Sequence, residues 1–238
     1  MRVTSDLKST TIALLTISLL LLGCNLSKLR PGGSSSSGND NSSRSGTAFN
    51  PSNDARKDLG DALRKLKTAY PYRLTETMSD TINGQTGPES TRVVDYAAAD
   101  RSHMKLTGVT DLEEITIGEK QYHRFSNGKW TESDSAAEKA LKTAELRAEE
   151  MLASATKDIK YVGAETVNGV PCYAYTWSLE MNVEGQNYSG TGKAWVGVAD
   201  GLLHQNNSEF KFGGYDQISK SHIVYEYNVN IKVEKPVP

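Results

Sequence analysis

Long stretches in which every second residue is apolar constrain the fold of this 238-residue chain more than any other feature. Between Pro171 and Met181, the odd-numbered positions from Tyr173 onwards are aromatic or aliphatic, whereas the even-numbered positions are small or polar. The stretch from Ile223 to Glu234 alternates in a similar way. Because successive side chains of a strand point to opposite faces, both stretches predict strands with one apolar and one largely polar face. Such strands are typical of an antiparallel sheet that packs one face against helices.

Four short turn signals separate the strand-like stretches. Asn-Gly and Asp-Gly pairs tolerate positive φ and are typical of two-residue hairpin turns, so they predict that neighbouring strands run antiparallel. The four pairs are Asn83-Gly84, Asn127-Gly128, Asn168-Gly169 and Asp200-Gly201.

Helical spacing occurs in two segments. The first follows the capping residues Pro51 to Asp54, continues with apolar residues three or four positions apart, and ends before Pro71. The second runs from Ser133 to Lys157 and has a stripe made mostly of alanine, which would let a sheet approach its backbone closely. Together these patterns predict an α+β fold: a curved antiparallel sheet, or incomplete β-barrel, wrapped around helices and preceded by a flexible linker.

Residues 1–24 have the pattern of an export signal. A positively charged start precedes an apolar core from Ile12 to Leu22. This core is too short to span a membrane, because a spanning helix needs about 20 apolar residues. The core ends in the sequence LLGC, which resembles a bacterial lipobox; in such precursors the cysteine, here Cys24, carries palmitate-type acyl chains and the chain is cut before it. An ordinary secretory signal with an incidental cysteine is the alternative.

A lipid on Cys24 would hold the protein on a membrane without a spanning helix, because several acyl chains anchor a protein firmly. The residues that follow are mostly Ser, Gly and Asn, and predict a disordered tether with a reach on the order of 28 Å. The expected organisation is a lipoprotein signal peptide over 1–23, the lipidated cysteine and its tether over 24–50, and one domain over 51–238. The expected location is the bacterial cell envelope. Asn25 is not the aspartate that retains lipoproteins at the inner membrane, which favours the periplasmic face of the outer membrane if the cell is Gram-negative.

The order of elements resembles the LolA/LolB and LppX/LprG group of proteins. The segments that carry the resemblance are YHRFSNGKW (122–130), YVGAETVNGVPCYAYTW (161–177), GKAWVGVADGLLHQ (192–205) and YEYNVNIKVEKP (225–236). The resemblance covers roughly residues 54–236 and implies a half-barrel whose concave face is plugged by helices and encloses an apolar cavity. It further implies binding of acyl chains and their transport between membranes, with neither catalysis nor a cofactor.

Four aromatic residues are candidate ligand contacts, because the aromatic face of a curved sheet opposite an alanine-rich helix suits acyl chains. The alternative is that each of them simply fills a solid core. The candidates are Trp130, Tyr175, Trp177 and Trp195.

Other classes of function are disfavoured. The formal net charge of −2 gives no basic field for nucleic acid. The four histidines lack the spacing of a metal site, and no nucleophile elbow, phosphate loop or other catalytic motif is present, so we expect no metal, no cofactor and no enzyme activity. Apart from Cys24, the only thiol is Cys172, which is predicted to be buried on the face opposite the aromatic residues.

Two hypotheses about function follow. The first is a membrane-anchored lipoprotein that binds a lipid or another apolar ligand in a half-barrel cavity and transfers it across the cell envelope. The second is a structural or interaction lipoprotein that binds another envelope protein through an exposed edge or patch and has no ligand cavity. The size of the cavity would distinguish them.

Substitution Cys24→Ala tests the predicted anchor. We expect the variant to lose all incorporation of radiolabelled palmitate in growing cells, because alanine has no thiol to acylate. The wild-type chain is the positive control, and continued labelling of the variant would contradict the prediction.

Overall fold

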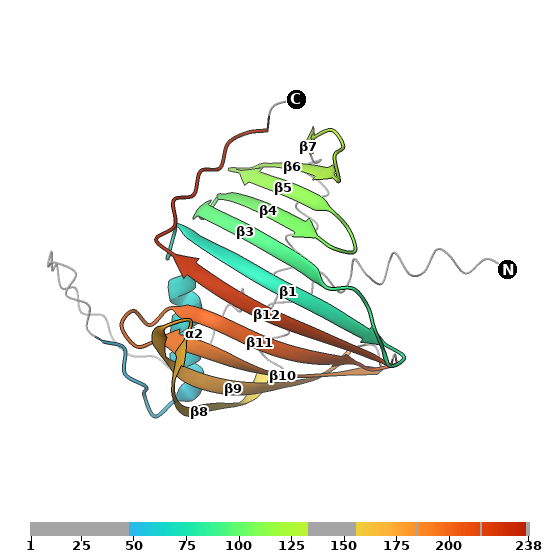
Figure 1. The fold of residues 1–238 in the computed structure, drawn as a ribbon. Helices are drawn as coiled ribbons and strands as arrows, with labels where there is room; N and C mark the ends of the chain where they lie inside the picture. The colour runs from blue at the N-terminus through green and yellow to red at the C-terminus, as the bar shows by residue number, and fades with distance from the viewer. Residues whose placement is uncertain (1–47, 133–155, 184, 215, 237–238) are drawn as a thin grey trace, which may run out of the picture.

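The computed structural model describes residues 48–132, 156–183, 185–214 and 216–236. Twelve strands within these ranges form one antiparallel sheet in the order β7-β6-β5-β4-β3-β1-β12-β11-β10-β9-β8, with the short strand β2 paired to β1 (Figure 1). The sheet is curved and open, since the terminal strands β7 and β8 are not paired with each other in the described part of the chain. The predicted curved antiparallel sheet is therefore confirmed.

The described helix and strands have the following bounds: α2 Ala55–Leu66, β1 Tyr72–Ile82, β2 Gln85–Thr86, β3 Ser90–Ala98, β4 Arg101–Thr107, β5 Leu112–Ile117, β6 Lys120–Phe125, β7 Thr131–Glu132, β8 Thr156–Val167, β9 Val170–Val183, β10 Gln186–Gly197, β11 Leu203–Phe212 and β12 Gln217–Tyr227.

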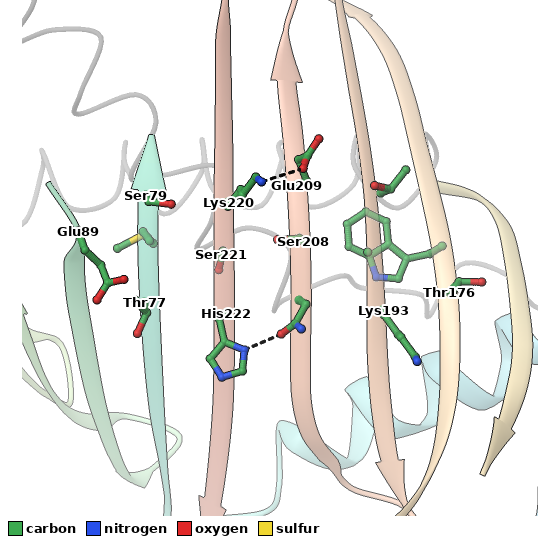
Figure 2. A pocket seen from close by; sticks show the side chains of 15 residues that line it. Thr77, Ser79, Glu89, Thr176, Lys193, Ser208, Glu209, Lys220, Ser221 and His222 are labelled. Atoms are coloured by element: carbon green, nitrogen blue, oxygen red, sulfur yellow. Dashed lines mark hydrogen bonds and ion pairs between the residues drawn. The ribbon is translucent and has the colours of Figure 1, made fainter. Parts of the chain in front are cut away.

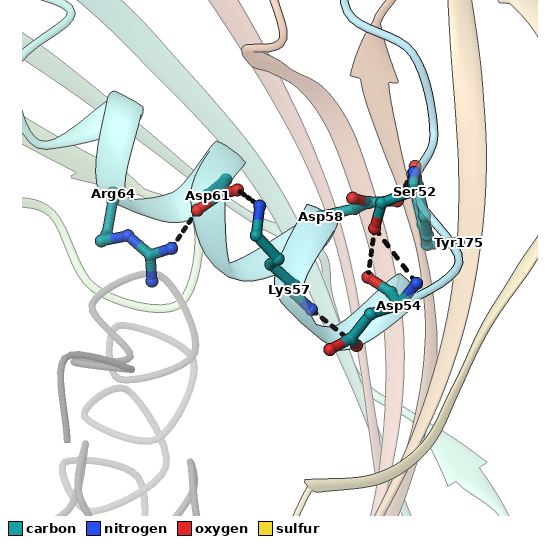
Figure 3. A network of polar contacts seen from close by, with 7 residues as sticks. All are labelled: Ser52, Asp54, Lys57, Asp58, Asp61, Arg64 and Tyr175. Atoms are coloured by element: carbon teal, nitrogen blue, oxygen red, sulfur yellow. Dashed lines mark hydrogen bonds and ion pairs between the residues drawn. The ribbon is translucent and has the colours of Figure 1, made fainter. Parts of the chain in front are cut away.

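Helix α2 begins where the sequence predicts. Asp54 is its N-cap residue, and a carboxylate oxygen of Asp54 accepts a hydrogen bond from the backbone N–H of Lys57 at 3.0 Å. One turn further on, the buried carboxylate of Asp58 accepts hydrogen bonds from the Ser52 backbone N–H at 2.8 Å and from the Tyr175 hydroxyl at 3.2 Å (Figure 3). These contacts attach the start of the helix to strand β9.

One face of the sheet packs against α2, and we call it the inner face; the opposite face is the outer face. Leu59, Ala62 and Leu66 of the helix form one buried cluster with apolar side chains of the sheet. The alternation in strand β9 therefore directs its aromatic residues to α2, whereas the sequence predicts that they face the alanine-rich helix, most of which lies outside the described residues. The strand residues of this cluster are Tyr72, Leu74, Val94, Tyr175, Trp177, Leu179, Ala194, Val196, Leu203, Phe210, Ile223 and Tyr225.

The outer face is less polar than the alternation predicts. Cys172 and Ala174 have no exposed surface, and they pack with Trp195 of the neighbouring strand, which is 6% exposed. The indole N–H of Trp195 donates a hydrogen bond to the carboxylate of Glu165 at 2.7 Å. Small residues such as these do not identify a solvent-facing row, because a large neighbour can cover them. The predicted burial of Cys172 is confirmed.

Strand β12 ends at Tyr227, whereas the alternation predicts a strand that continues to Glu234. Asn228 has a φ of 58° and turns the chain out of the ladder. The tail that follows runs past the ends of the neighbouring strands (Figure 1). There Val233 packs against Ile115 and Tyr122 in a second buried cluster. An apolar residue of the predicted strand is thus buried although the tail forms no strand.

Two of the four predicted hairpin turns are confirmed. Asn83-Gly84 joins β1 to β2 and Asn168-Gly169 joins β8 to β9, and all four residues have positive φ. Asn127-Gly128 and Asp200-Gly201 lie in longer loops, between β6 and β7 and between β10 and β11.

The predicted signal peptide, Cys24, most of the tether and residues 133–155 of the second predicted helix lie outside the described residues. The last two residues of that predicted helix, Thr156 and Lys157, begin strand β8 instead. Phe49, at the predicted end of the tether, donates a backbone hydrogen bond to the carbonyl oxygen of Val198 at 2.7 Å, and its ring contacts that of Tyr173. The folded domain thus begins before residue 51.

The two edges of the sheet are irregular or very short. Edge strand β8 has register shifts between Lys157 and Lys160 and between Tyr161 and Gly163. The other edge strand, β7, has only two residues.

The aromatic packing on the inner face depends on Gly192. A Cβ atom on Gly192 would lie 2.2 Å from the indole ring of Trp177 and 2.7 Å from the carbonyl oxygen of Asn207. We expect Gly192→Ala to lower the free energy of unfolding by about 1–3 kcal/mol, because overpacking displaces side chains and backbone.

Gly87→Ala is the matched control, because its Cβ would meet nothing closer than 3.6 Å. Thermal denaturation should show a lower midpoint for Gly192→Ala by several degrees and little change for Gly87→Ala. Equal midpoints for the two variants would contradict this account of the packing.

Candidate functional site

The structure brings together two of the four aromatic residues that the sequence identifies as candidate ligand contacts. Tyr175 and Trp177 both lie on the inner face, in the cluster with helix α2. The Tyr175 hydroxyl is occupied by its hydrogen bond to Asp58, and burial raises the pKa of this hydroxyl above its ordinary value. The Trp177 ring lies across Gly192, with its centroid 5.9 Å from that of Phe210. These two residues form part of an apolar wall.

The other two candidates belong to the outer face. Trp195 pairs with Ala174 in the ladder, on the side away from α2, and the ammonium group of Lys193 lies 5.0 Å from its ring centroid. Trp130 lies in the loop before β7, where the guanidinium of Arg124 is 4.7 Å from its ring centroid. Each ring has a cation over it, which is a common way to cover an aromatic ring at a surface.

The inner face contains a buried ion pair that the sequence analysis does not predict. Glu76 of β1 and Arg92 of β3 are directly opposite each other in the ladder, and their side chains are 0% and 1% exposed. A guanidinium nitrogen of Arg92 lies 2.5 Å from a carboxylate oxygen of Glu76. The Ser221 hydroxyl of β12 donates a hydrogen bond, also at 2.5 Å, to the other carboxylate oxygen. Three neighbouring strands therefore supply one buried polar centre.

The ladder register extends this centre over four strands. Ile223 lies opposite both Glu76 and Asn206, which places the ion pair and the Asn206 amide in one row. Two more polar residues on the inner face adjoin this row, Tyr225 in one direction and Ser208 in the other. Strands β3, β1, β12 and β11 are consecutive, so the polar centre spans about 14 Å at the usual strand spacing.

Several polar atoms of this centre have no hydrogen bond within the described part of the chain. They are Nε and a terminal nitrogen of Arg92, one carboxylate oxygen of Glu76, the Ser208 hydroxyl and the Tyr225 hydroxyl. The close contact of Arg92 with Glu76 is thus an ion pair whose angles do not make a hydrogen bond. Burial raises the pKa of Tyr225 well above its ordinary value, so its hydroxyl is a neutral donor. Each unpaired buried group costs about 1–3 kcal/mol unless a partner satisfies it.

Apolar side chains flank the polar centre on both sides. Toward β9 the inner face continues with Phe210, Trp177 and Leu179, and toward β4 it continues with Val94 and Leu106. Among the described elements, helix α2 packs chiefly against β8, β10 and β11. The inner face is therefore an apolar wall with a buried polar middle.

A groove of about 680 Å³ lies on the outer face and crosses strands β1, β12, β11, β10 and β9 (Figure 2). The ammonium group of Lys220 lies 3.5 Å from the carboxylate of Glu209, and His222 makes a hydrogen bond of 2.6 Å to the amide oxygen of Asn207. Lys193 reaches the groove from β10, and Thr77, Ser79, Thr176 and Thr191 add hydroxyl groups. Residues of the intervening inner-face row also line the groove, namely Met78, Trp177, Gly192, Ser208 and Ser221. The groove therefore combines charged groups with apolar surface.

Other kinds of site are not found among the described residues. They contain no group of His, Cys, Asp or Glu that could hold a metal ion. They also contain no helix that is long and apolar enough to cross a membrane. Burial raises the pKa of the Cys172 thiol to about 11, so this thiol is protonated and unreactive at neutral pH.

Comparisons with known proteins find similar solved structures but no match by sequence. No protein-family model matches the chain, and no curated protein matches it. The lipoprotein LppX of Mycobacterium tuberculosis has 9% sequence identity and a TM-score of 0.45 over 76% of this chain and 98% of its own. LprF from Mycobacterium bovis has 11% identity and a TM-score of 0.45 over 79% of this chain and 99% of its own. A LolA superfamily protein from Nitrosomonas europaea has 6% identity and a TM-score of 0.32 over 75% of this chain and 94% of its own.

The ion pair should behave as one energetic unit. We expect Arg92→Met to lower the free energy of unfolding by about 3–5 kcal/mol, because it leaves the Glu76 carboxylate buried without a counter-charge. The double variant Glu76→Leu/Arg92→Met should lose much less than the sum of the two single variants.

Urea unfolding at pH 7 measures these differences. Asp95→Asn is the matched control, because Arg73 and Asp95 form a 2.6 Å ion pair between the same two strands on the outer face, where both side chains are partly exposed. That substitution should change stability by less than about 1 kcal/mol. Additivity of the two inner-face substitutions within about 0.5 kcal/mol would show that the residues are not coupled.

Proposed function

We propose that this protein is a lipid-anchored component of the bacterial cell envelope whose half-barrel domain binds an amphiphilic lipid on its inner face and transfers it between membranes. The observation that carries the proposal is the composition of the inner face. A wall of aromatic and aliphatic side chains surrounds a buried polar centre whose hydrogen-bonding atoms are incompletely paired. An acyl chain would lie against the apolar part, and a polar head group would satisfy the centre.

Energetics supports a sheltered lipid. Moving a hydrocarbon chain through water exposes its surface at a cost of about 25 cal/mol for each Å². A protein surface that covers the chain removes this cost. The sequence also supports a place at a membrane, because Cys24 stands where a lipobox has its acylated cysteine and a Ser/Gly-rich tether follows it.

Lipid extraction tests the proposal directly. The chain from Asn25 onwards, exported without lipidation and purified without detergent, should yield a stoichiometric lipid when organic extracts are analysed by mass spectrometry. A chain that carries no lipid and also fails to bind a fluorescent monoacylglycerol would contradict the proposal.

Tryptophan quenching locates the ligand. A monoacylglycerol whose acyl chain carries two bromine atoms should quench the fluorescence of Trp177, because bromine quenches only at close contact. We expect Trp177→Phe to lose most of the quenching and Trp195→Phe to retain it, since Trp195 is equally buried but lies on the opposite face. Trp130→Phe is a second control on the outer face. Equal loss in all three variants would place the ligand elsewhere.

The outer groove favours a second function, the binding of another envelope protein. Its lining carries both signs of charge beside apolar surface, a mixture that is typical of the interfaces between proteins. A photo-cross-linking amino acid in place of Thr191 should capture a specific partner in cells, whereas the same amino acid in place of Asp158, outside the groove, should not. Identical products from both positions would mean that the groove is not a binding surface.

A further inference from the structure

We propose that the buried pair of Glu76 and Arg92 makes the inner face selective for amphiphiles with an uncharged polar head group, and that Glu76 is the residue that determines this selectivity. The inference rests on the proposed lipid-binding function and specifies its ligand. It follows from the charge balance of the polar centre and from the kind of polar atoms that the centre leaves unpaired.

The charge balance disfavours an anionic head group. Arg92 is the one cation among the buried residues of the described chain, and the carboxylate 2.5 Å away neutralises it. Asp80 lies two ladder rows further along the same face of β1, and one of its carboxylate oxygens is buried without a hydrogen bond. A carboxylate or phosphate that entered this centre would lose its hydration and find no free positive charge, so its burial would be strongly unfavourable.

The unpaired atoms favour a head group rich in hydroxyl or ester oxygens. Nε of Arg92 and the hydroxyls of Tyr225 and Ser208 are hydrogen-bond donors without an acceptor among the described residues. Both carboxylate oxygens of Glu76 are already in contact, one with Arg92 and the other with Ser221. The ester and hydroxyl oxygens of a glycerol ester could accept from the open donors, and the group carries no charge. The apolar side chains on both sides of the centre would then contact its hydrocarbon.

The test compares two ligands with the same acyl chain, 1-monooleoylglycerol and oleate, at pH 8 and below their aggregation concentrations. We expect the full mature chain to bind the glycerol ester at least tenfold more tightly than the anion. Equal binding of the two, or tighter binding of oleate, would overturn the inference and leave the proposed lipid binding intact. Failure to bind either ligand would instead count against the proposed function itself.

Glu76→Gln should reverse the preference. The amide keeps the shape of the side chain but removes its charge, so the Arg92 guanidinium becomes available to an anion. The ratio of the dissociation constants for oleate and 1-monooleoylglycerol should fall by tenfold or more. Asp95→Asn is the matched control, because it removes a carboxylate from the ion pair between the same strands on the outer face, and it should leave the ratio unchanged. An unchanged ratio in a folded Glu76→Gln variant would refute the role of Glu76.

Tyr225→Phe provides a test that does not disturb the ion pair. Its hydroxyl has no hydrogen bond to any described residue, so its removal should not destabilise the empty protein. We expect the affinity for 1-monooleoylglycerol to fall about three- to tenfold, the usual effect of losing one hydrogen bond. Unchanged affinity in this variant would contradict the placement of the head group even if Glu76→Gln does not fold.

Discussion

Two aromatic rings from β9 and β11 meet above the strand that separates them, and the inner face depends on this contact. Trp177 and Phe210 can approach because β10 has glycine beneath both rings, Gly190 and Gly192. With no side chain there, the sheet surface is low at β10 and high on both sides. The rings fill this depression and continue the apolar wall from the helix to the centre of the sheet.

The polar centre is the opposite kind of feature, because it weakens the apolar wall in which it lies. The attraction between two buried charges offsets only part of the free energy lost when both leave water. Apolar residues of similar size would often stabilise such a position more. Its arrangement, with one ion pair, one hydroxyl bound to it and several donors without a hydrogen bond among the described residues, therefore adds little to stability. Under the proposed function, the apolar wall would contact the hydrocarbon of a lipid and the polar centre its head group.

The period of two predicted the sheet and the shared face of Tyr175 and Trp177, and the spacing of three and four predicted the helix that packs on it. The same period does not predict the face of Trp195, because its strand contains no long alternation. The sequence therefore groups Trp195 with Tyr175 and Trp177, although it lies on the opposite face of the sheet. Glu76 and Arg92 also left a signal: each stands within a row of alternating apolar residues, Leu74–Glu76–Met78 and Arg92–Val94–Tyr96. Only the pairing of β1 with β3 shows that the two charges meet, and pairing between strands cannot be read from one strand alone.

The irregular edges of the sheet disfavour the pairing of one copy of the domain with another through their strands. An open sheet could extend indefinitely by adding strands of a second copy at either edge. Strand β8 discourages this, since Asp158 and Gly163 have positive φ at its register shifts and interrupt the row of hydrogen-bonding groups. Strand β7 is too short to serve as a template. Edge-to-edge pairing between neighbouring copies is thus disfavoured even at the high local concentration that a shared surface would produce.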